Sequence, residues 1–184
     1  MEMKDQVAIL TGALTIMHPD MYVTGWEAMD RLGNWAKEQG KESMLNAITM
    51  WPTIYNMASV MVNRASPLHL DRNGQPQWLD LLVGVGDYSN LDFVIPTISL
   101  RVHYNPGTIL GLSGQLLEHG VGKAEGDRGI ISLYMRDNVH EYMDVVCCNY
   151  MECSNIPCYG RSLAPNITDL VVCLFASYLI SCLD

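Results

Sequence analysis

The stretch SPLHLDRNGQPQWLDLLVG, residues 66–84, places a histidine and an aspartate two positions apart in an apolar, strand-like region. In a β-strand, residues i and i+2 point to the same face, so His69 and Asp71 project together. Leu68 and Leu70 then project to the other side. An imidazole beside a carboxylate is compatible with a metal site, an acid–base pair or a chance arrangement. This spacing alone does not distinguish these three possibilities, so the rest of the chain has to be considered.

The composition indicates one globular domain and an acidic surface. The chain has 184 residues, of which 49% are hydrophobic and 17% charged, so it is long enough to bury a core and too apolar to be disordered. Its net charge of −9 differs from the basic surplus that most nucleic-acid-binding proteins carry. Any contact with DNA would therefore need a local basic patch or help from segments outside this chain.

The first twenty residues, MEMKDQVAILTGALTIMHPD, lack the basic segment, apolar run and cleavage site of a signal peptide. We therefore expect an intracellular protein whose six cysteines, all between Cys147 and Cys182, are mostly reduced.

The region from about residue 20 to 50 has a helical pattern. In GWEAMDRLGNWAKEQG, residues 25–40, Trp26, Met29, Leu32 or Gly33, and Ala36 recur at spacings of three and four. KESMLNAITMW, which follows directly, predicts a second short helix that ends before a proline. The sequence thus predicts a helical N-terminal part, residues 1–52.

From residue 53 the pattern changes to short apolar runs separated by turn residues, at a spacing of about ten residues. The runs are TIYNMASVMVNRAS, QWLDLLVGVGDY, LDFVIPTISLRVHYN, TILGLSG and GIISLYMRD. This pattern predicts an antiparallel barrel or jelly roll over residues 53–146. The expected fold class is α+β, mainly β, with the N-terminal helices packed on the β core, so that residues 1–146 form one domain.

Residues 147–184 are predicted to be a cysteine-rich C-terminal extension. The spacing of Cys147, Cys148, Cys153 and Cys158 is not the paired C-x-x-C of a usual zinc site, which favours free thiols. The run LVVCLFASYLISCL has fourteen uncharged residues, fewer than the ~20 that span a bilayer. It predicts a buried or docking helix without membrane contact, and the alternative is a tail anchor.

His119 completes a candidate metal site with His69 and Asp71. Two histidines and one carboxylate are the ligands of the facial triad that holds non-haem Fe(II), which leaves positions open for a 2-oxo acid and O₂. Arg128 follows nine residues after His119. A guanidinium there can hold the distal carboxylate of 2-oxoglutarate through two parallel hydrogen bonds. The alternative for Arg128 is an ion pair with a neighbouring acidic residue, Asp127 or Glu125.

The strand that begins at Arg128 has one polar and one apolar face. Alternation predicts that its polar face lines the site. That face carries Arg128, Ile130, Ser132, Tyr134 and Arg136. Ser132 is expected to support the co-substrate carboxylate, and Arg136 to meet an anionic substrate.

Other polar residues near these runs are weaker candidates. Asn63 and Arg64 precede the His-x-Asp pair and are candidates for contact with co-substrate or substrate, although turn formation explains Asn63 equally well. His103 either lines the pocket or is a structural histidine. Arg136 and His140 are candidates for contacts with a base or a phosphate.

Three segments carry a resemblance to a known family: LHLD, YNPGTILGLSGQLLEHGV and GDRGIISLYMRDNVHE. They resemble the TET/JBP branch of 2-oxoglutarate- and Fe(II)-dependent dioxygenases, in the form found in basidiomycete fungi. The resemblance covers roughly Met17 to Glu141. It implies a double-stranded β-helix, Fe(II) held by His69, Asp71 and His119, and 2-oxoglutarate anchored by Arg128.

The activity that this resemblance implies is the oxidation of the methyl group of 5-methylcytosine in DNA. O₂ and 2-oxoglutarate would be consumed and succinate released, with the base flipped out of the duplex. A nuclear location would follow. Several alternatives stay open: the same chemistry on N6-methyladenine, thymine or RNA, hydroxylation of a protein or small molecule, an inert binding module, or a structural fragment. The sequence does not indicate an oligomeric state.

Overall fold

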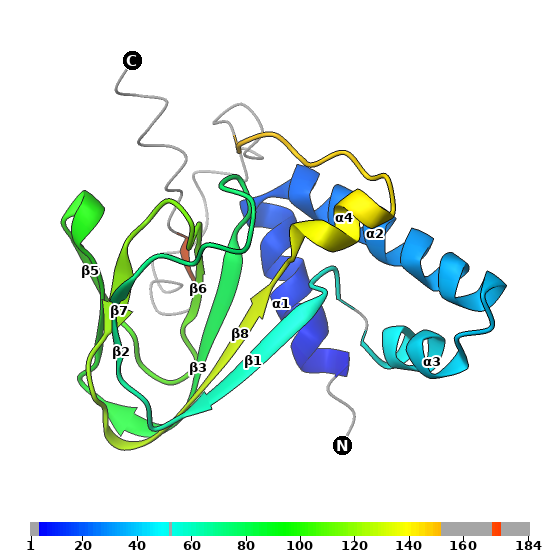
Figure 1. Ribbon diagram of the computed structural model, residues 1–184. Helices are drawn as coiled ribbons and strands as arrows, with labels where there is room; N and C mark the ends of the chain where they lie inside the picture. Colours follow the sequence, from blue (N-terminus) through cyan, green and yellow to red (C-terminus); the bar gives the residue numbers. More distant parts are fainter. Residues whose placement is uncertain (1–3, 52, 152–170, 174–184) are drawn as a thin grey trace, which may run out of the picture.

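The computed structural model describes residues 4–51, 53–151 and 171–173, and in this part of the chain helices precede and cover a pair of β-sheets (Figure 1). The helices are α1 (Lys4–Met17), α2 (Pro19–Glu38), α3 (Glu42–Met50), the 3₁₀ helix η1 (Pro96–Ile98) and α4 (Asp137–Tyr142). The strands are β1 (Met57–Val62), β2 (Ser66–His69), β3 (Asp80–Ser89), β4 (Asp92–Ile95), β5 (Leu100–His103), β6 (Ile109–Leu112), β7 (His119–Val121), β8 (Glu125–Tyr134) and β9 (Val171–Cys173). The fold is therefore mixed α+β and mainly sheet, as the sequence predicts.

The helices α2 and α3 confirm the pattern between residues 20 and 50. His18 caps α2 because its Nδ1 accepts a hydrogen bond from the Met21 N–H, and Pro19 occupies the first turn, where no N–H is needed. Gly40 follows the helix at φ +62°, the left-handed conformation that glycine adopts at helix ends.

The helix α1 precedes residues 20–50, the segment in which the spacing of apolar residues predicts a helix. Its inner face buries Val7, Leu10 and Leu14, but Ile9 and Ile16 on the outer face are 63% and 54% exposed. With apolar side chains on both faces, no polar face marks the helix in the sequence.

The two sheets are built from pairs of strands that lie far apart in the chain. One sheet has the order β1-β8-β3-β6-β9 and the other β2-β7-β4-β5. The antiparallel pairs β1 with β8, β2 with β7, β3 with β6 and β4 with β5 connect the first four strands to the next four in reverse order. Residues of the early strands are therefore brought beside residues of the late ones, as with His69 and His119.

Two apolar layers hold this arrangement together. Side chains of α1 and α2, such as Leu14 and Met21, pack on the outer face of the five-stranded sheet against Leu81 and Leu133. A second cluster fills the space between the sheets. Its buried members are Tyr88, Leu91, Phe93, Ile95, Tyr104, Leu110, Leu112, Leu117, Val121 and Ile130. The second layer surrounds the site described below.

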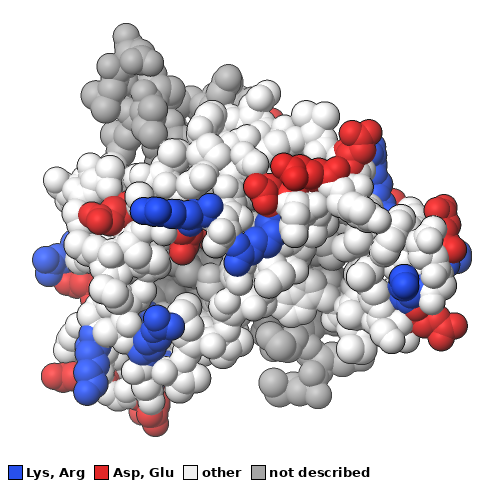
Figure 2. Space-filling view, viewed as in Figure 1, with Lys and Arg blue, Asp and Glu red and all other residues white. Residues whose placement is uncertain are grey.

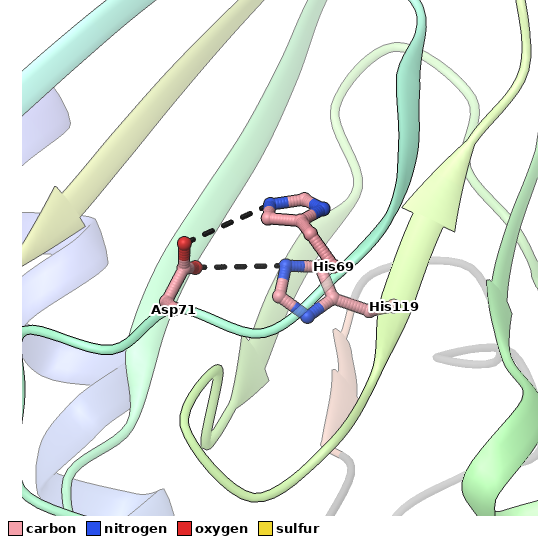
Figure 3. A group of neighbouring side chains, drawn as sticks. All are labelled: His69, Asp71 and His119. Carbon is pink, nitrogen blue, oxygen red and sulfur yellow. Dashed lines mark ion pairs between the residues drawn. The ribbon is translucent and has the colours of Figure 1, made fainter.

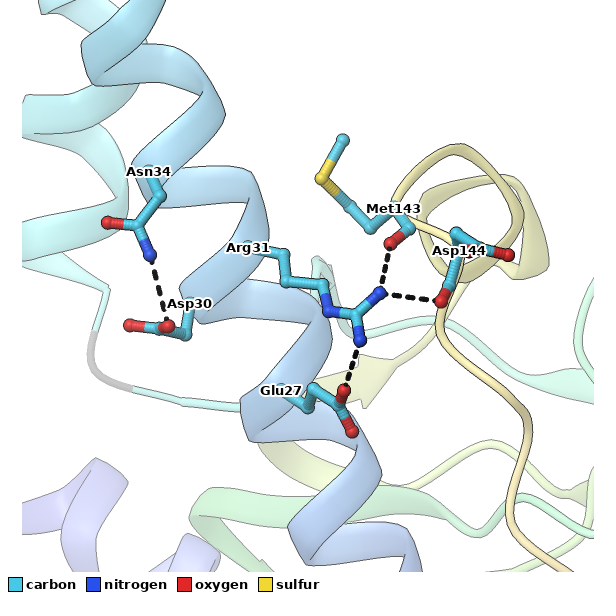
Figure 4. A network of polar contacts seen from close by, with 6 residues as sticks. All are labelled: Glu27, Asp30, Arg31, Asn34, Met143 and Asp144. Atoms are coloured by element: carbon cyan, nitrogen blue, oxygen red, sulfur yellow. Dashed lines mark hydrogen bonds and ion pairs between the residues drawn. The ribbon is translucent and has the colours of Figure 1, made fainter.

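Arg31 joins α2 to the end of α4. Its NH1 donates to the carbonyl oxygens of Met143 (2.9 Å) and Asp144 (2.6 Å), and its NH2 donates to Glu27 Oε1 at 2.6 Å (Figure 4). The carbonyls at the end of a helix need such donors. This contact holds α4, and with it the end of β8, against the helical layer.

The prediction of a helix over residues 170–183 is wrong for Val171–Cys173, which form the strand β9 and pair in parallel with β6. β-branched residues suit a strand, and the edge of β6 offers backbone hydrogen bonds. The rest of that run lies outside the described residues, as do Cys153 and Cys158.

Cys147 and Cys148 are free thiols, as expected. No helix within the described ranges is long and apolar enough to cross a membrane.

Candidate metal centre and anion pocket

The two histidines face each other across neighbouring strands. His69 is the last residue of β2 and pairs in register with His119, the first residue of β7. Their ring centroids are 4.4 Å apart, and the His119 ring stacks on Phe93 at 5.5 Å. Antiparallel pairing of β2 with β7 thus explains why residues so far apart in sequence meet.

Asp71 completes the group from just beyond the end of β2. The sequence predicts it within the strand, but β2 ends at His69. The Asp71 N–H still donates to the Gly114 carbonyl at 2.8 Å, so the extended course continues and the carboxylate faces both imidazoles (Figure 3). Asp71 Oδ1 lies 3.7 Å from His69 Nε2, and Oδ2 lies 3.6 Å from His119 Nε2.

The hydrogen bonds of the imidazoles favour one tautomer. His69 Nδ1 lies 2.8 Å from the Pro67 carbonyl and His119 Nδ1 lies 2.9 Å from the Leu117 carbonyl. A carbonyl only accepts, so each Nδ1 carries the hydrogen and each Nε2 presents a lone pair. Those lone pairs face the Asp71 oxygens, which also only accept, at distances too long for hydrogen bonds.

An arrangement of three electron-pair donors without a proton between them suits a cation. One ligand atom from each of His69, Asp71 and His119 lies within 4.8 Å of the others, so this group can hold a metal ion. Burial is the main cause that lowers the pKa of His119, which keeps its imidazole neutral and able to bind a metal at pH 7. The His119 side chain is 5% exposed, whereas those of His69 and Asp71 are 39% and 53% exposed, so the group is reachable from one side.

The metal-binding group lies in a cavity of about 280 Å³ between the sheets. The polar face of β8 lines this cavity, as predicted, with Arg128, Ile130, Ser132 and Tyr134 among its walls. Arg136 also lines it, but β8 ends at Tyr134, so this residue follows the strand and precedes α4. Arg64 also contributes to the lining.

Arg128 is buried in this cavity with most of its donors unused. The residue is 2% exposed, and its NH1 donates to the Arg64 carbonyl at 3.1 Å. Its Nε and NH2 have no hydrogen-bond partner among the described residues. The rings of Tyr104 and Tyr88 lie 5.5 and 6.0 Å from its Cζ. The alternative of an ion pair with Asp127 or Glu125 is not met, because no carboxylate in the described part of the chain pairs with Arg128.

Asn63 holds Arg128 from outside the cavity, which corrects the prediction that it contacts the co-substrate. Its Oδ1 accepts a hydrogen bond from the Arg128 N–H at 2.7 Å, and its own N–H donates to the Arg128 carbonyl at 2.8 Å. Asn63 adopts φ +51° at the end of β1, a conformation that asparagine tolerates. It is therefore a turn residue that fixes the backbone of Arg128.

Two predicted histidines also lie outside the cavity lining. The expectation that His103 lines the pocket is wrong: its side chain is 86% exposed and its Nδ1 lies 3.0 Å from Asp92 Oδ1. Alternation correctly groups His103 with Arg101, but their shared face of β5 is the outer one. His140 is 3% exposed and packs on Trp78, so the prediction that it meets a base or phosphate is also wrong.

Asp80 and Gln115 line the cavity and were not predicted. A Cβ placed on Gly114 would lie 2.7 Å from Asp71 Oδ2 and 2.9 Å from Asp80 Oδ2, so both carboxylates converge on this glycine. Burial, and next the nearby Asp71, raise the pKa of Asp80 to about 8, while Arg136 opposes the rise. The signal in the sequence was a lone acidic residue within the apolar run QWLDLLVG. Gln115 has a buried Oε1 without a partner among the described residues.

Comparison of the chain with models of known protein families and with curated protein sequences gives no match. The interpretation of the site therefore rests on its geometry and on the resemblance of its sequence segments.

Proposed function

We propose that the chain is a 2-oxoglutarate- and Fe(II)-dependent dioxygenase that oxidises the methyl group of 5-methylcytosine in DNA. One observation carries the proposal: a single cavity is lined both by the metal-binding group and by Arg128, which is buried with two unused donors. A buried charge without a partner is costly, so a carboxylate ligand is the simplest reason for its position.

The ligand set favours iron(II). Two neutral imidazoles and one carboxylate, with the remaining positions open, are typical of the facial triad of non-haem Fe(II) oxygenases. The Nδ1 contacts of His69 and His119 with backbone carbonyls are the outer hydrogen bonds that orient such ligands.

The surroundings of Arg128 favour a dicarboxylic co-substrate. Because NH1 already donates to Arg64, the Nε and NH2 donors remain for one carboxylate. The hydroxyl groups of Tyr88 and Tyr104 are also buried without partners among the described residues, and both rings flank the guanidinium. An acid held here at one end and by a metal at the other matches 2-oxoglutarate in its two carboxylates and its keto group.

The strand pairing supports the finer fold assignment, a double-stranded β-helix. In a jelly roll of this kind, eight strands form two sheets in which the first strand pairs with the eighth and the fourth with the fifth. The pairs β1 with β8 and β4 with β5 follow that scheme. The segments that resemble the TET/JBP branch supply all four proposed site residues, which supports 5-methylcytosine as the substrate.

The chemistry divides between the metal and the protein. Bound iron(II) would supply dioxygen activation, so that one oxygen atom enters the methyl C–H bond and the other enters 2-oxoglutarate, which releases CO₂ and succinate. Arg128 orients the co-substrate, and the apolar walls, including Phe93 and Val121, keep bulk water from it. A methyl group inside a duplex cannot reach this cavity, so the base must flip out.

The proposal is tested by measuring succinate after the purified protein is incubated with Fe(II), 2-oxoglutarate and O₂. We expect succinate to rise with methylated DNA and not with unmethylated DNA, and 5-hydroxymethylcytosine to appear among the recovered nucleosides by mass spectrometry. His69→Ala should abolish both signals because it removes a metal ligand. His103→Ala is the matched control, because that histidine lies outside the cavity and should leave both unchanged.

Three results would contradict the proposal in different ways. Succinate that forms equally with and without DNA points to a protein or small-molecule substrate. If succinate rises only with N6-methyladenine, thymine or RNA, the chemistry is as proposed but the substrate is a different one. A protein that binds neither metal nor 2-oxoglutarate is an inert module.

A further inference from the structure

Apart from the buried Arg128, the arginines of the described residues fall into two groups. Arg31 and Arg101 are exposed on the outer surface, and each pairs with a carboxylate: Arg31 with Glu27 at 2.6 Å and Arg101 with Asp92 at 3.2 Å. Arg64, Arg72 and Arg136 have no carboxylate within ion-pair distance among the described residues. In a chain with a net charge of −9, three such arginines without a carboxylate partner suggest that they bind an anionic ligand.

These three arginines line two adjoining hollows. Arg64 and Arg136 line the cavity that holds the metal-binding group. Arg136 and Asn73 also line a second hollow of about 520 Å³, to which Arg72 contributes. The two hollows share Arg136 and Asn73, so the second one, called the groove below, adjoins the cavity at these two side chains.

The groove is lined by groups that suit a phosphodiester backbone. Besides Arg72 and Arg136, its walls carry the amide side chains of Asn73 and Asn138. The amide of Asn56 also lines it, but it is bound to the backbone of Arg136: its nitrogen donates to the Arg136 carbonyl at 3.2 Å and its oxygen accepts from the Arg136 N–H at 2.9 Å. Its one carboxylate, Asp137, accepts a hydrogen bond from the Asn138 N–H at 2.9 Å. Arginine and amide groups are the usual donors to phosphate oxygens. On the visible face, acidic side chains form a band over α4, while Lys and Arg side chains lie over the strands with further acidic side chains between them (Figure 2).

We propose that this groove binds the phosphodiester backbone of the DNA strand whose base enters the cavity, with Arg72 and Arg136 on phosphates and Arg64 on the opposite rim. This inference rests on the proposed function for the identity of the base, but not for the contact itself. It accounts for the local basic patch that DNA binding requires of an acidic protein.

The test uses the metal-free, full-length protein and a fluorescein-labelled DNA duplex with one central 5-methylcytosine. Fluorescence anisotropy gives the dissociation constant at several salt concentrations. Each phosphate contact contributes about 0.9 to the slope of log K against log salt, so Arg72→Ala and Arg136→Ala should each lower that slope by about one. At 0.1 M salt this corresponds to about an eightfold loss of affinity for each arginine.

Matched controls separate phosphate contacts from general charge effects. Arg101→Ala removes the same charge from the outer surface and should leave slope and affinity unchanged. Arg72→Lys keeps a cation and should keep most of the slope. The double variant R72A/R136A should lose about two from the slope, and circular dichroism checks that each variant remains folded.

Several outcomes would overturn the proposal that the groove binds the DNA backbone. One is a wild-type protein that does not bind the duplex. Another is that the Arg72 and Arg136 variants keep the same salt dependence of binding as Arg101→Ala. A third is that an acidic peptide competes for the protein as well as unlabelled DNA does. The last result would indicate a protein partner. Because the measurement needs neither iron nor turnover, its failure is distinct from failure of the succinate assay.

Discussion

Two arginines of this protein, Arg31 and Arg128, have opposite surroundings. Arg31 lies at the junction of α2 and α4, where its donors meet two carbonyl oxygens and the carboxylate of Glu27 (Figure 4). Arg128 lies between the sheets, 2% exposed, with one donor on a carbonyl and two donors unused. The exposed arginine is satisfied by the protein itself, and the buried one is not.

This difference separates a structural contact from a binding site. A guanidinium that is bound by backbone carbonyls and neutralised by a carboxylate, as Arg31 is, stabilises the fold. A buried guanidinium with free donors costs stability, which a ligand carboxylate can recover. The same contrast applies to His69 and His119, whose Nε2 lone pairs face other acceptors, and to the exposed His103, whose ring meets Asp92.

The largest expected effect is the loss of metal affinity when one of the three proposed ligands is removed. His119→Ala removes one of three ligands, so we expect metal affinity to fall by about a thousandfold or more, since binding by fewer protein ligands no longer forms the facial triad. Isothermal titration calorimetry with Mn(II) measures this loss. Arg31→Ala should bind the metal as the wild type does. An unchanged affinity in His119→Ala would remove His119 from the ligand set.

The next effect concerns the co-substrate. Arg128→Met keeps the length of the side chain and removes its charge, so 2-oxoglutarate affinity should fall by about a hundredfold, the cost of losing a buried charge-assisted pair. Titration of the Mn(II)-loaded protein with 2-oxoglutarate measures it, and Mn(II) affinity serves as the internal control. If Arg128→Met binds 2-oxoglutarate normally, the carboxylate lies elsewhere.

A smaller effect is expected at Gly114. An added Cβ would lie 2.7 Å from Asp71 Oδ2, too close to be accommodated without moving the carboxylate. Gly114→Ala should therefore reduce metal affinity by about 10- to 100-fold, the range typical of changes behind a ligand. Gly107→Ala is a less crowded control, because nothing lies within 4 Å of the added atom, although its φ of +88° adds strain. Equal metal affinity in Gly114→Ala and wild type would show that Asp71 is free to move.

The comparison of the two arginines also predicts opposite changes in stability. In the absence of ligand, Arg128→Met should raise the free energy of unfolding by about 1–2 kcal/mol, because it removes a buried charge that lacks a partner. Arg31→Ala should lower it by about 1 kcal/mol, because it frees helix-end carbonyls and breaks an exposed pair. Urea denaturation measures both, and a change of the same sign would contradict the comparison.

The smallest predicted effect is a pH dependence from His140, a buried ring outside the cavity. Burial lowers the pKa of His140, and neither ring nitrogen has a partner among the described residues. Since its pKa is lower in the folded state than the usual value of about 6.5, stability is complete above that pH and falls as the pH drops through the folded-state pKa. His140→Phe should weaken this fall. Burial also lowers the pKa of His18 and His119, so part of it remains.

The sequence predicts those features that depend on alternation within one strand. The polar face of β8 and the shared side of His69 and Asp71 follow from a two-residue period, and both are found. Alternation does not tell which face of a strand is the inner one, which is why the sequence left two alternatives open for His103. The pairing that brings His119 beside His69 is a long-range property, and only the resemblance indicated it.

Other parts of the site have no local signal. The burial of Asp80 depends on the convergence of Gly114 and Asp71 from separate segments. The unused donors of Arg128 become visible only when the whole set of neighbours is known. Asn63 shows the reverse case: its turn chemistry is evident in the sequence, and the structure makes it a support for Arg128 rather than a ligand contact.

The central claim is that one metal ion and one dicarboxylic acid share the cavity between the sheets. A crystal structure of the protein grown without oxygen in the presence of Fe(II) and 2-oxoglutarate tests it most directly. The predicted result is a single ion bound by Nε2 of His69, Nε2 of His119 and a carboxylate oxygen of Asp71, with the far carboxylate of the acid on Nε and NH2 of Arg128. An ion bound away from these three residues, or an acid that leaves the Arg128 donors unpaired, would contradict it.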